Sequence, residues 1–309
     1  MDSNTLLEIK GLSISFNMYK KGFKRIKYHA INDLSLQLNY GEVLAIVGSS
    51  GSGKSLLAHS IMGLLPKNAD VGGKIFYHGK ELTKRSIEKL RGSNIALIPQ
   101  SMTYLDPLMK VGRQVRGSDR GEESKKRQRL SFNKYDLCEK TEKLYPYQLS
   151  GGMARRALIS TAAQKDGDLI IADEPTPGLD LHLALKTLKY FRDFADEGKG
   201  VLIITHDIDL ALNVADKIAV FYGGTILEVA SVRDFQLGVK ALRHPYTQAL
   251  YKALPQNGCR PIKGYQPYGE DLPKGCIFSP RCENARESCK TKKIEMREVR
   301  DGFVRCDYA

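Results

Sequence analysis

The sequence has no apolar run that approaches the roughly 18 residues needed to cross a bilayer. Its opening stretch, "MDSNTLLEIK", also lacks the basic start and apolar segment of a secretory signal. We therefore expect a protein that stays inside the cell. The 309 residues are 42% hydrophobic and 27% charged, which is ordinary for a soluble globular protein with one large core and a small appendage.

Acidic residues are the scarcer charge, with 35 Asp and Glu against 48 Lys and Arg, so the formal net charge is +13. Such a balance favours anionic partners, namely nucleotides, nucleic acid or an acidic membrane face. The chain also lacks internal repeats and holds only one phosphate-loop motif. Any second nucleotide site must then come from another chain.

Four short apolar runs alternate with longer amphipathic segments, which predicts a mostly parallel sheet covered by helices. The runs are "EVLAIVG" (42–48), "NIALIPQ" (94–100), "DLIIADE" (168–174) and "VLIITHD" (201–207). Ligands of open parallel sheets bind beyond the carboxyl ends of the strands. We therefore expect an α/β fold whose functional residues follow these runs.

Two other regions depart from this alternation. Strand-like runs vanish between residues 101 and 156, which predicts an inserted helical subdomain. Residues 255–275 contain four prolines and four glycines, which favours a linker or extended arm. The predicted organisation is a nucleotide-binding domain over 1–235 and a C-terminal extension over 236–309.

The segment "GSSGSGKS" fits the pattern G-x-x-x-x-G-K-[ST] and lies between a strand run and an amphipathic helix. Its glycines allow backbone N–H groups to face phosphate oxygens. Lys54 is expected to neutralise the β and γ phosphates, and the Ser55 hydroxyl to bind Mg²⁺. The predicted nucleotide-binding residues are Gly48, Ser49, Ser50, Gly51, Ser52, Gly53, Lys54, Ser55 and Leu56.

The segment "DLIIADEP" places two carboxylates at the end of a strand run. Asp173 suits the Mg²⁺ shell, and Glu174 suits the polarisation of an attacking water. A strand that ends in acidic residues is common, but its combination with the phosphate loop indicates a hydrolase of ATP.

With "LSGGM" at 149–153, the chain resembles the ATP-binding cassette (ABC) family over residues 5 to 235. The resemblance implies a phosphate-loop core of RecA type with an inserted helical subdomain. It implies that Glu174 is the general base, that His206 in "ITHD" contacts the γ-phosphate, and that Gln100 in "IPQ" links Mg²⁺ and water to the partner that moves. Together with Lys54, these residues form the expected catalytic set.

The same resemblance gives roles to residues that lie away from this chain's own nucleotide. Ser150, Gly151, Gly152 and Met153 form the signature, which opens a helix and binds the ATP of a second subunit. Asp180 in "PGLD" matches the D-loop. Methionine replaces the common glutamine of the signature, and only 49 residues separate Gln100 from Ser150.

The family pattern also implies an aromatic residue that stacks on adenine. Phe16, which ends the first strand-like run, matches this position. An aromatic residue on a first strand is as easily part of the core, and Tyr19 and Tyr28 compete for the stacking role.

The tail segments "RHPYTQALYKALP" (243–255) and "GCIFSPRC" (275–282) resemble the C-terminal extension of the ATPases that serve peptide and nickel importers. This resemblance implies two membrane permease subunits, an extracytoplasmic substrate-binding protein and a second, non-identical ATPase subunit. It implies a peripheral position on the cytoplasmic face of the membrane and import of peptides, nickel or nickel chelates.

Four of the six cysteines fall in the tail at Cys276, Cys282, Cys289 and Cys306. In a chain that stays inside the cell, they favour thiols or metal ligands over disulfides. The resemblance implies a four-iron four-sulfur cluster; zinc and free thiols remain alternatives, although the paired C-x2-C spacing of structural zinc sites is missing. We expect an independent mini-domain that metal holds together.

Two other classes of protein remain as alternatives. A nucleic-acid-associated ABC ATPase would fit the positive charge, but repair types need a long coiled-coil insertion and translation types need two cassettes. A component of an ABC exporter would lack the "HPYT" extension. We therefore expect no nucleic-acid partner.

Overall fold

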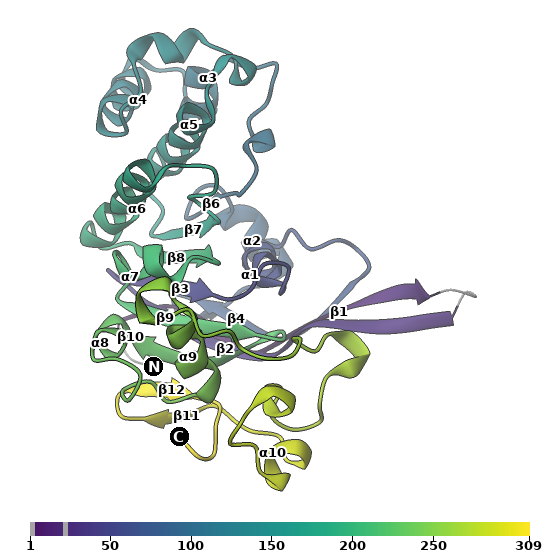
Figure 1. Ribbon diagram of the computed structural model, residues 1–309. Helices are drawn as coiled ribbons and strands as arrows, with labels where there is room; N and C mark the ends of the chain where they lie inside the picture. The colour runs from purple at the N-terminus through teal and green to yellow at the C-terminus, as the bar shows by residue number, and fades with distance from the viewer. Residues whose placement is uncertain (1–3, 21–23) are drawn as a thin grey trace.

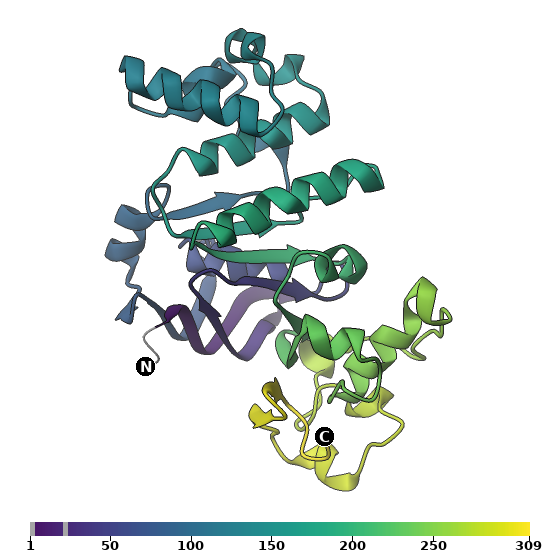
Figure 2. The same ribbon diagram turned by 90° about the vertical axis from the view of Figure 1, so that its left-hand side faces the viewer.

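The computed structural model describes residues 4–20 and 24–309. Within this part of the chain, no helix combines the length and apolar character that crossing a membrane requires. The described elements form two sheets, a helical lobe and a C-terminal extension, which Figure 1 shows from one side and Figure 2 after a quarter turn.

The main sheet has the strand order β11-β12-β10-β9-β3-β8-β7-β6. Its central part is parallel, as predicted, because crossover segments connect these strands in sequence. These parallel strands are β3 (Val43–Val47), β6 (Ile95–Ile98), β7 (Leu169–Asp173), β8 (Gly200–Thr205) and β9 (Lys217–Tyr222). The antiparallel edge consists of β10 (Thr225–Ser231), β11 (Arg297–Val299) and β12 (Gly302–Val304).

The second sheet is antiparallel and has the order β2-β1-β4-β5. Its strands are β1 (Thr5–Lys20), β2 (Lys24–Asn39), β4 (Ala69–Tyr77) and β5 (Lys80–Glu81). In Figure 1 the long β1 and β2 strands project sideways from the body of the molecule.

The hydrophobic core has two layers because side chains alternate across the buried strands of the main sheet. On β3, Val43, Ala45 and Val47 join one apolar cluster, whereas Leu44 and Ile46 join the other. The first cluster includes residues of the helical lobe and of the C-terminal extension, and the second includes residues of the antiparallel sheet. The β3 strand therefore ends inside the packed centre of the molecule.

The helices lie around these sheets. α1 (Lys54–Ile61) follows β3, α2 (Lys84–Leu90) follows β5, and α6 (Leu181–Asp196) and α7 (Ile208–Leu212) follow β7 and β8. The helical lobe at the top of Figure 1 is inserted in the sequence between β6 and β7. It contains α3 (Val111–Arg116), α4 (Glu122–Lys134), α5 (Gly151–Ala163) and the 3₁₀ turns η1 (Met102–Tyr104), η2 (Glu139–Lys143) and η3 (Pro146–Gln148).

The C-terminal extension begins near α8 (Val232–Gln236) and continues through short elements to the β11–β12 hairpin. These elements are α9 (Pro245–Ala253), α10 (Glu287–Thr291) and the turns η4 (Pro255–Asn257), η5 (Gly269–Asp271) and η6 (Ser279–Arg281). In both views they lie at the end of the molecule opposite the helical lobe.

The extension is part of the main sheet and of its core, which corrects the expectation of an independent mini-domain. β12 pairs with β10, with Val304 opposite Glu228. Phe278 is buried, and its ring packs edge-on against Tyr222 of β9. The tail therefore shares the apolar core of the main body instead of relying on a core of its own.

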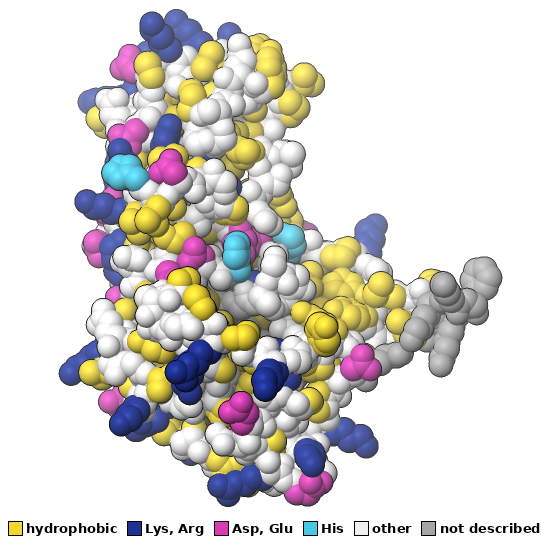
Figure 3. Space-filling view, in the orientation of Figure 1, with side chains coloured by type: hydrophobic (Ala, Val, Ile, Leu, Met, Phe, Trp, Pro, Cys, Tyr) yellow, Lys and Arg dark blue, Asp and Glu magenta, His cyan; other side chains and the backbone are white. Residues whose placement is uncertain are grey.

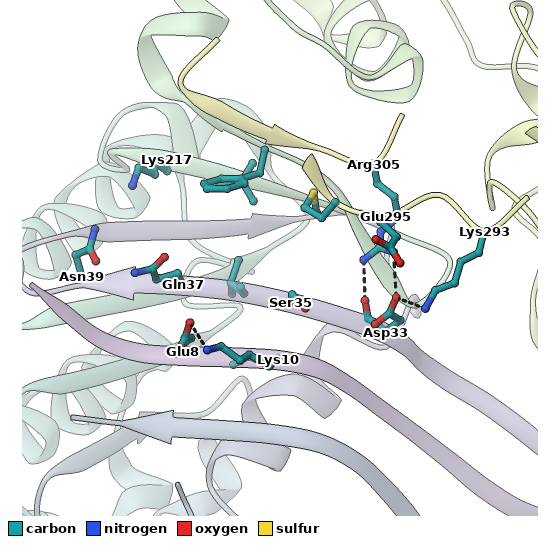
Figure 4. A pocket seen from close by; sticks show the side chains of 15 residues that line it. Glu8, Lys10, Asp33, Ser35, Gln37, Asn39, Lys217, Lys293, Glu295 and Arg305 are labelled. Atoms are coloured by element: carbon teal, nitrogen blue, oxygen red, sulfur yellow. Dashed lines mark hydrogen bonds and ion pairs between the residues drawn. The ribbon is translucent and has the colours of Figure 1, made fainter. Parts of the chain in front are cut away.

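A cluster of charges also fixes the extension to β2, as Figure 4 shows. Arg305 donates hydrogen bonds to the Asp33 carbonyl at 2.8 Å and to its carboxylate at 3.2 Å, and Lys293 lies 2.9 Å from the same carboxylate. Burial alone would raise the pKa of Asp33, but Lys293 and Arg305 together lower it. Beside this cluster, a cavity of about 450 Å³ lies between the antiparallel sheet and the hairpin.

A buried carboxylate makes a further connection. Glu228 of β10 is fully buried and accepts hydrogen bonds from the backbone N–H groups of Arg243 and His244, each at 2.8 Å. The Arg243 guanidinium lies 3.5 Å from the same carboxylate. Because a buried charge is stable only with such partners, β10 depends on residues of the extension.

Candidate active site

Three neighbouring strands place the predicted catalytic groups at one edge of the sheet. β3, β8 and β7 are adjacent and parallel, so the phosphate loop after β3, His206 after β8, and Asp173 and Glu174 at the end of β7 come together. Figure 3 shows histidine and acidic side chains gathered near the middle of this face, between the helical lobe and the extension. The sequence-based expectation of convergence agrees with this arrangement.

The phosphate loop runs from Gly48 to the start of α1. A Cβ atom at Gly48 would lie 2.5 Å from the carbonyl oxygen of Phe221, so only glycine permits this close approach to β9. Gly53 has a φ of 99°, which glycine adopts without steric cost. The loop therefore needs glycine for its contact with β9 and for its turn into α1.

Lys54 is buried and donates hydrogen bonds to the carbonyl oxygens of Gly48 and Ser49, at 2.9 and 2.8 Å. Burial lowers the pKa of Lys54, and the negative charges of Glu174 and Asp173 partly oppose that shift. The ammonium group thus lies inside the loop, at the position from which it can neutralise phosphate oxygens.

The Ser55 hydroxyl donates a hydrogen bond of 3.0 Å to Asp173. Burial raises the pKa of Asp173, and the hydrogen bond from Ser55 partly opposes the rise. A hydroxyl and a carboxylate oxygen together suit a hard cation such as Mg²⁺. Gln100, the third predicted ligand, follows β6 and is exposed. Among the described residues, its contact with the site is the hydrogen bond that its backbone carbonyl accepts from Arg155.

Glu174 and His206 form a direct pair, with 2.9 Å between Oε2 and Nδ1. The Glu174 side chain is 8% exposed and that of His206 is 55% exposed. Glu174 has a φ of 48°, an uncommon left-handed conformation, while its N–H still donates to the Ile204 carbonyl at 2.8 Å. Such backbone strain concentrates at functional sites.

Arg155 connects three parts of the site and is a residue that the sequence analysis missed. From α5 it donates a hydrogen bond of 2.8 Å to the Glu174 carbonyl and one of 3.5 Å to the Gln100 carbonyl. Burial lowers the pKa of Arg155, and Glu174 partly opposes this. The available signal was its helical spacing from Leu158 and Ile159, which puts a charge on an apolar face.

Comparisons with known proteins identify the family. Residues 31–177 match the ABC transporter family, and residues 227–289 match the C-terminal region of oligopeptide/dipeptide transporters. The oligopeptide transport ATP-binding protein OppD of Salmonella typhimurium is 36% identical over 306 residues, which cover 93% of this chain and 89% of the relative. The chain belongs to the ABC transporter ATP-binding proteins.

Other similar proteins support this assignment. The oligopeptide transport ATP-binding protein AppD of Bacillus subtilis is 33% identical, with 98% of this chain and 96% of the relative covered. A dimeric bacterial ABC transporter cassette superposes with a TM-score of 0.64 at 28% identity, over 74% of this chain and 99% of that one. The same cassette bound to ADP and phosphate after hydrolysis also has a TM-score of 0.64, at 27% identity over the same shares of the two chains. The protein is thus an ATPase of the ABC fold, as the sequence predicted.

In this ABC ATPase the signature lies at the surface. Ser150 is exposed and caps α5, because its hydroxyl accepts a hydrogen bond of 3.3 Å from the Met153 N–H. Gly151 and Gly152 follow in the first turn. Asp180 caps α6 in the same way by accepting from the Leu183 N–H at 2.9 Å. Within the described part of the chain, no hydrogen bond or ion pair joins the signature residues 150–153 to this chain's phosphate loop.

The aromatic candidates lie on the β1–β2 hairpin, Phe16 and Tyr28 where the pairing of β1 with β4 ends and Tyr19 closer to the hairpin tip. Phe16 pairs with Tyr28 across the two strands, and it is half-buried against the apolar cluster of the antiparallel sheet. Tyr28 is half-buried as well, with its ring against Gly269 of the extension, whereas Tyr19 is 65% exposed. Phe16 therefore packs against the core with part of its side chain and leaves the rest exposed to solvent.

The four tail cysteines form no disulfide in the described structure, and they lie close enough to affect one another's pKa. The Cys276 N–H donates to the Cys289 carbonyl at 2.7 Å. Burial raises the pKa of Cys276 to about 11, and the other three thiols add to the shift. Burial also raises the pKa of Cys282 and Cys306. Among the described residues, no three or more His, Cys, Asp or Glu side chains are grouped so as to hold a metal ion.

Proposed function

We propose that this ABC ATPase powers the import of peptides through a separate membrane permease. The observation that carries the proposal is the match of residues 227–289 to the C-terminal region of oligopeptide/dipeptide transporters. The relatives described above are named for oligopeptide transport, and nickel appears in neither name. Peptides are therefore the proposed substrate class, in preference to nickel or nickel chelates.

The proposed chemistry follows from the strand-end groups. Lys54 binds the β and γ phosphates, and Ser55 and Asp173 hold Mg²⁺. Glu174 takes the proton of the attacking water, and His206, 2.9 Å away, orients that carboxylate and contacts the γ-phosphate. Phe16 stacks on the adenine. Support comes from the mutual contacts of these groups at one edge of the sheet.

The remaining family residues act between molecules. The exposed signature, Ser150 to Met153, binds the ATP held by a second, non-identical ATPase subunit, and Asp180 lies in the loop that meets that subunit. Gln100 would join Ser55 and Asp173 in holding Mg²⁺, and it would pass the effect of nucleotide binding to the permease. Its exposure beyond β6 and the Arg155 hydrogen bond to its carbonyl support this role.

The proposed assembly contains two membrane permease subunits, two different ATPase subunits and an extracytoplasmic substrate-binding protein. The ATPase is then a peripheral protein on the cytoplasmic face of the membrane, and nucleic acid is not a partner. The family assignment favours this assembly over a repair, translation or exporter ATPase.

The four tail cysteines are proposed to hold a four-iron four-sulfur cluster, with zinc as the alternative. Their number and their soft thiolate chemistry suit such a group. Because the described side chains are not grouped as metal ligands, binding would have to draw them together. When bound, the group would cross-link the loops around 276–306. Iron, sulfide and zinc contents of anaerobically purified protein decide the matter: equal iron and sulfide support the cluster, and zinc without sulfide contradicts it.

Uptake assays test the proposed transport function. A strain that lacks the gene is complemented with the wild type or with Glu174→Gln, and uptake of labelled di- and oligopeptides and of nickel is measured. We expect peptide uptake to return only with the wild type. Restoration of nickel uptake without peptide uptake would overturn the proposed substrate class.

A further inference from the structure

The extension reaches the phosphate loop through residues 262–272, here called the arm. The Ser49 hydroxyl of the phosphate loop donates a hydrogen bond of 3.0 Å to the side-chain oxygen of Gln266, a residue 217 positions later in the chain. A segment that the sequence predicted to be a linker thus contacts a residue of the nucleotide site.

The arm is held in place on both sides of Gln266. Arg281, one residue before Cys282, donates to the carbonyl oxygens of Lys263 at 2.9 Å and Ile262 at 3.1 Å. The same guanidinium donates to the Tyr222 hydroxyl at the end of β9, at 3.2 Å. Beyond Gln266, Gly269 packs against the Tyr28 ring, so the arm is held from the cysteine-bearing loop to the β1–β2 hairpin.

Gln266 differs from its neighbour in how it is placed. Its amide nitrogen is buried and has no hydrogen-bond partner among the described residues, whereas Tyr265 is 94% exposed. Gln266 is therefore the residue of the arm that packs inward and contacts the phosphate loop.

We propose that Gln266 is a positioning residue for nucleotide binding: through Ser49 the arm holds the phosphate loop in the conformation that receives phosphate. Because the loop is ordered before the nucleotide arrives, less ordering free energy is lost on binding. Gln266 makes no recorded contact with Glu174 or His206 in the described structure. Its removal should therefore weaken binding and leave the chemical step largely intact.

This inference extends the proposed role of the phosphate loop and makes the extension a determinant of ATP affinity. Since Arg281 sets the position of the arm, changes around Cys282 are transmitted to Ser49 through main-chain contacts of the arm. The coupling is reciprocal, so nucleotide binding should also protect the arm.

The test uses the full-length chain and measures the affinity for ATP and ADP by calorimetry, together with KM and kcat for hydrolysis. Gln266→Ala should weaken binding and raise KM by about 5-fold or more, a typical size for coupling between sites, with kcat within about 2-fold. Tyr265→Ala is the matched control and should match the wild type. Equal affinities for the wild type and Gln266→Ala overturn the inference.

Double substitutions test the route. Ser49→Ala and Arg281→Lys should each weaken nucleotide binding, and neither should weaken it further in the Gln266→Ala background, because all act through one contact. Additive losses would contradict the route through the arm. Melting temperatures identify any variant that is merely unfolded, and failure of the wild type to bind ATP would refute the proposed site instead of the role of Gln266.

Discussion

His206 and Glu174 meet across two adjacent parallel strands, with 2.9 Å between Nδ1 of the histidine and Oε2 of the glutamate. The histidine is the exposed member of the pair and the glutamate the buried one. A buried carboxylate that an exposed imidazole orients has the arrangement expected of a general base that must face an incoming water.

Replacement of Glu174 by glutamine should leave ATP binding intact and reduce turnover by about 100-fold or more, the usual contribution of a general base. The amide keeps the shape of the side chain but cannot take a proton. Phosphate release and equilibrium nucleotide binding measure the two effects. Glu88→Gln, at an exposed position on α2, is the control, and near-normal hydrolysis by Glu174→Gln would refute the assignment.

Asp173→Asn should stabilise the nucleotide-free protein while abolishing hydrolysis. Burial raises the pKa of Asp173, so the folded state loses stability as the pH rises from the unfolded value of 3.8 through the higher folded value. The full penalty remains at neutral pH, and asparagine removes it. We expect the melting temperature of the nucleotide-free variant at neutral pH to lie above that of the wild type. A lower melting temperature at neutral pH would contradict this.

His244→Asn should reduce the acid sensitivity of the fold. His244 is buried and caps α9 through Nδ1, and burial lowers its pKa from 6.5 to about 3. The unfolded state therefore binds the extra proton below pH 6.5, and stability falls from there toward pH 3. The slope is about 1.4 kcal/mol per pH unit.

Asparagine offers its side-chain oxygen as the acceptor for the Tyr246 N–H in place of the His244 Nδ1, and it does not titrate. Urea unfolding across the acid range should show a slope smaller by about one proton in His244→Asn. The exposed His182→Asn variant should keep the slope of the wild type. Identical slopes in all three proteins would exclude His244 as the source of the acid sensitivity.

Asp33→Asn should loosen the β11–β12 hairpin, because Arg305 and Lys293 lose the negative charge that holds them. Hydrogen bonds to charged groups contribute about 1.5–3 kcal/mol, so amide exchange over residues 297–304 should accelerate by about 10-fold or more. Exchange is measured by mass spectrometry, with Glu298→Gln on the same hairpin as control. Unchanged exchange in Asp33→Asn would show that strand pairing alone holds the tail.

The sequence predicted those parts of the molecule that short segments determine. The phosphate loop needs only its glycines, Lys54 and the adjoining strand and helix, all within a few residues. The parallel strands were predictable because each is a continuous apolar run. The order of the motifs then placed Asp173, Glu174 and His206 at the same edge of the sheet.

Contacts between distant residues could not be predicted in this way. Arg305 lies 272 positions from Asp33, and neither residue belongs to a motif or an apolar pattern that would join them. The turn residues of 255–275 indicated an extended segment, but turn chemistry says nothing of what such a segment contacts. The four tail cysteines likewise suggested a mini-domain that metal holds together, and nothing in the sequence showed that Phe278 uses the core of the main body.

The buried pair of Glu228 and Arg243 has a consequence for biosynthesis. When the ribosome has made the cassette up to residue 235, β10 has an open edge and Glu228 has neither of its backbone donors from 243 and 244. Such edges promote aggregation during folding. The nascent ATPase should therefore depend on chaperones until its tail emerges, and a chain that ends at the apparent domain boundary should be recovered mainly as insoluble protein.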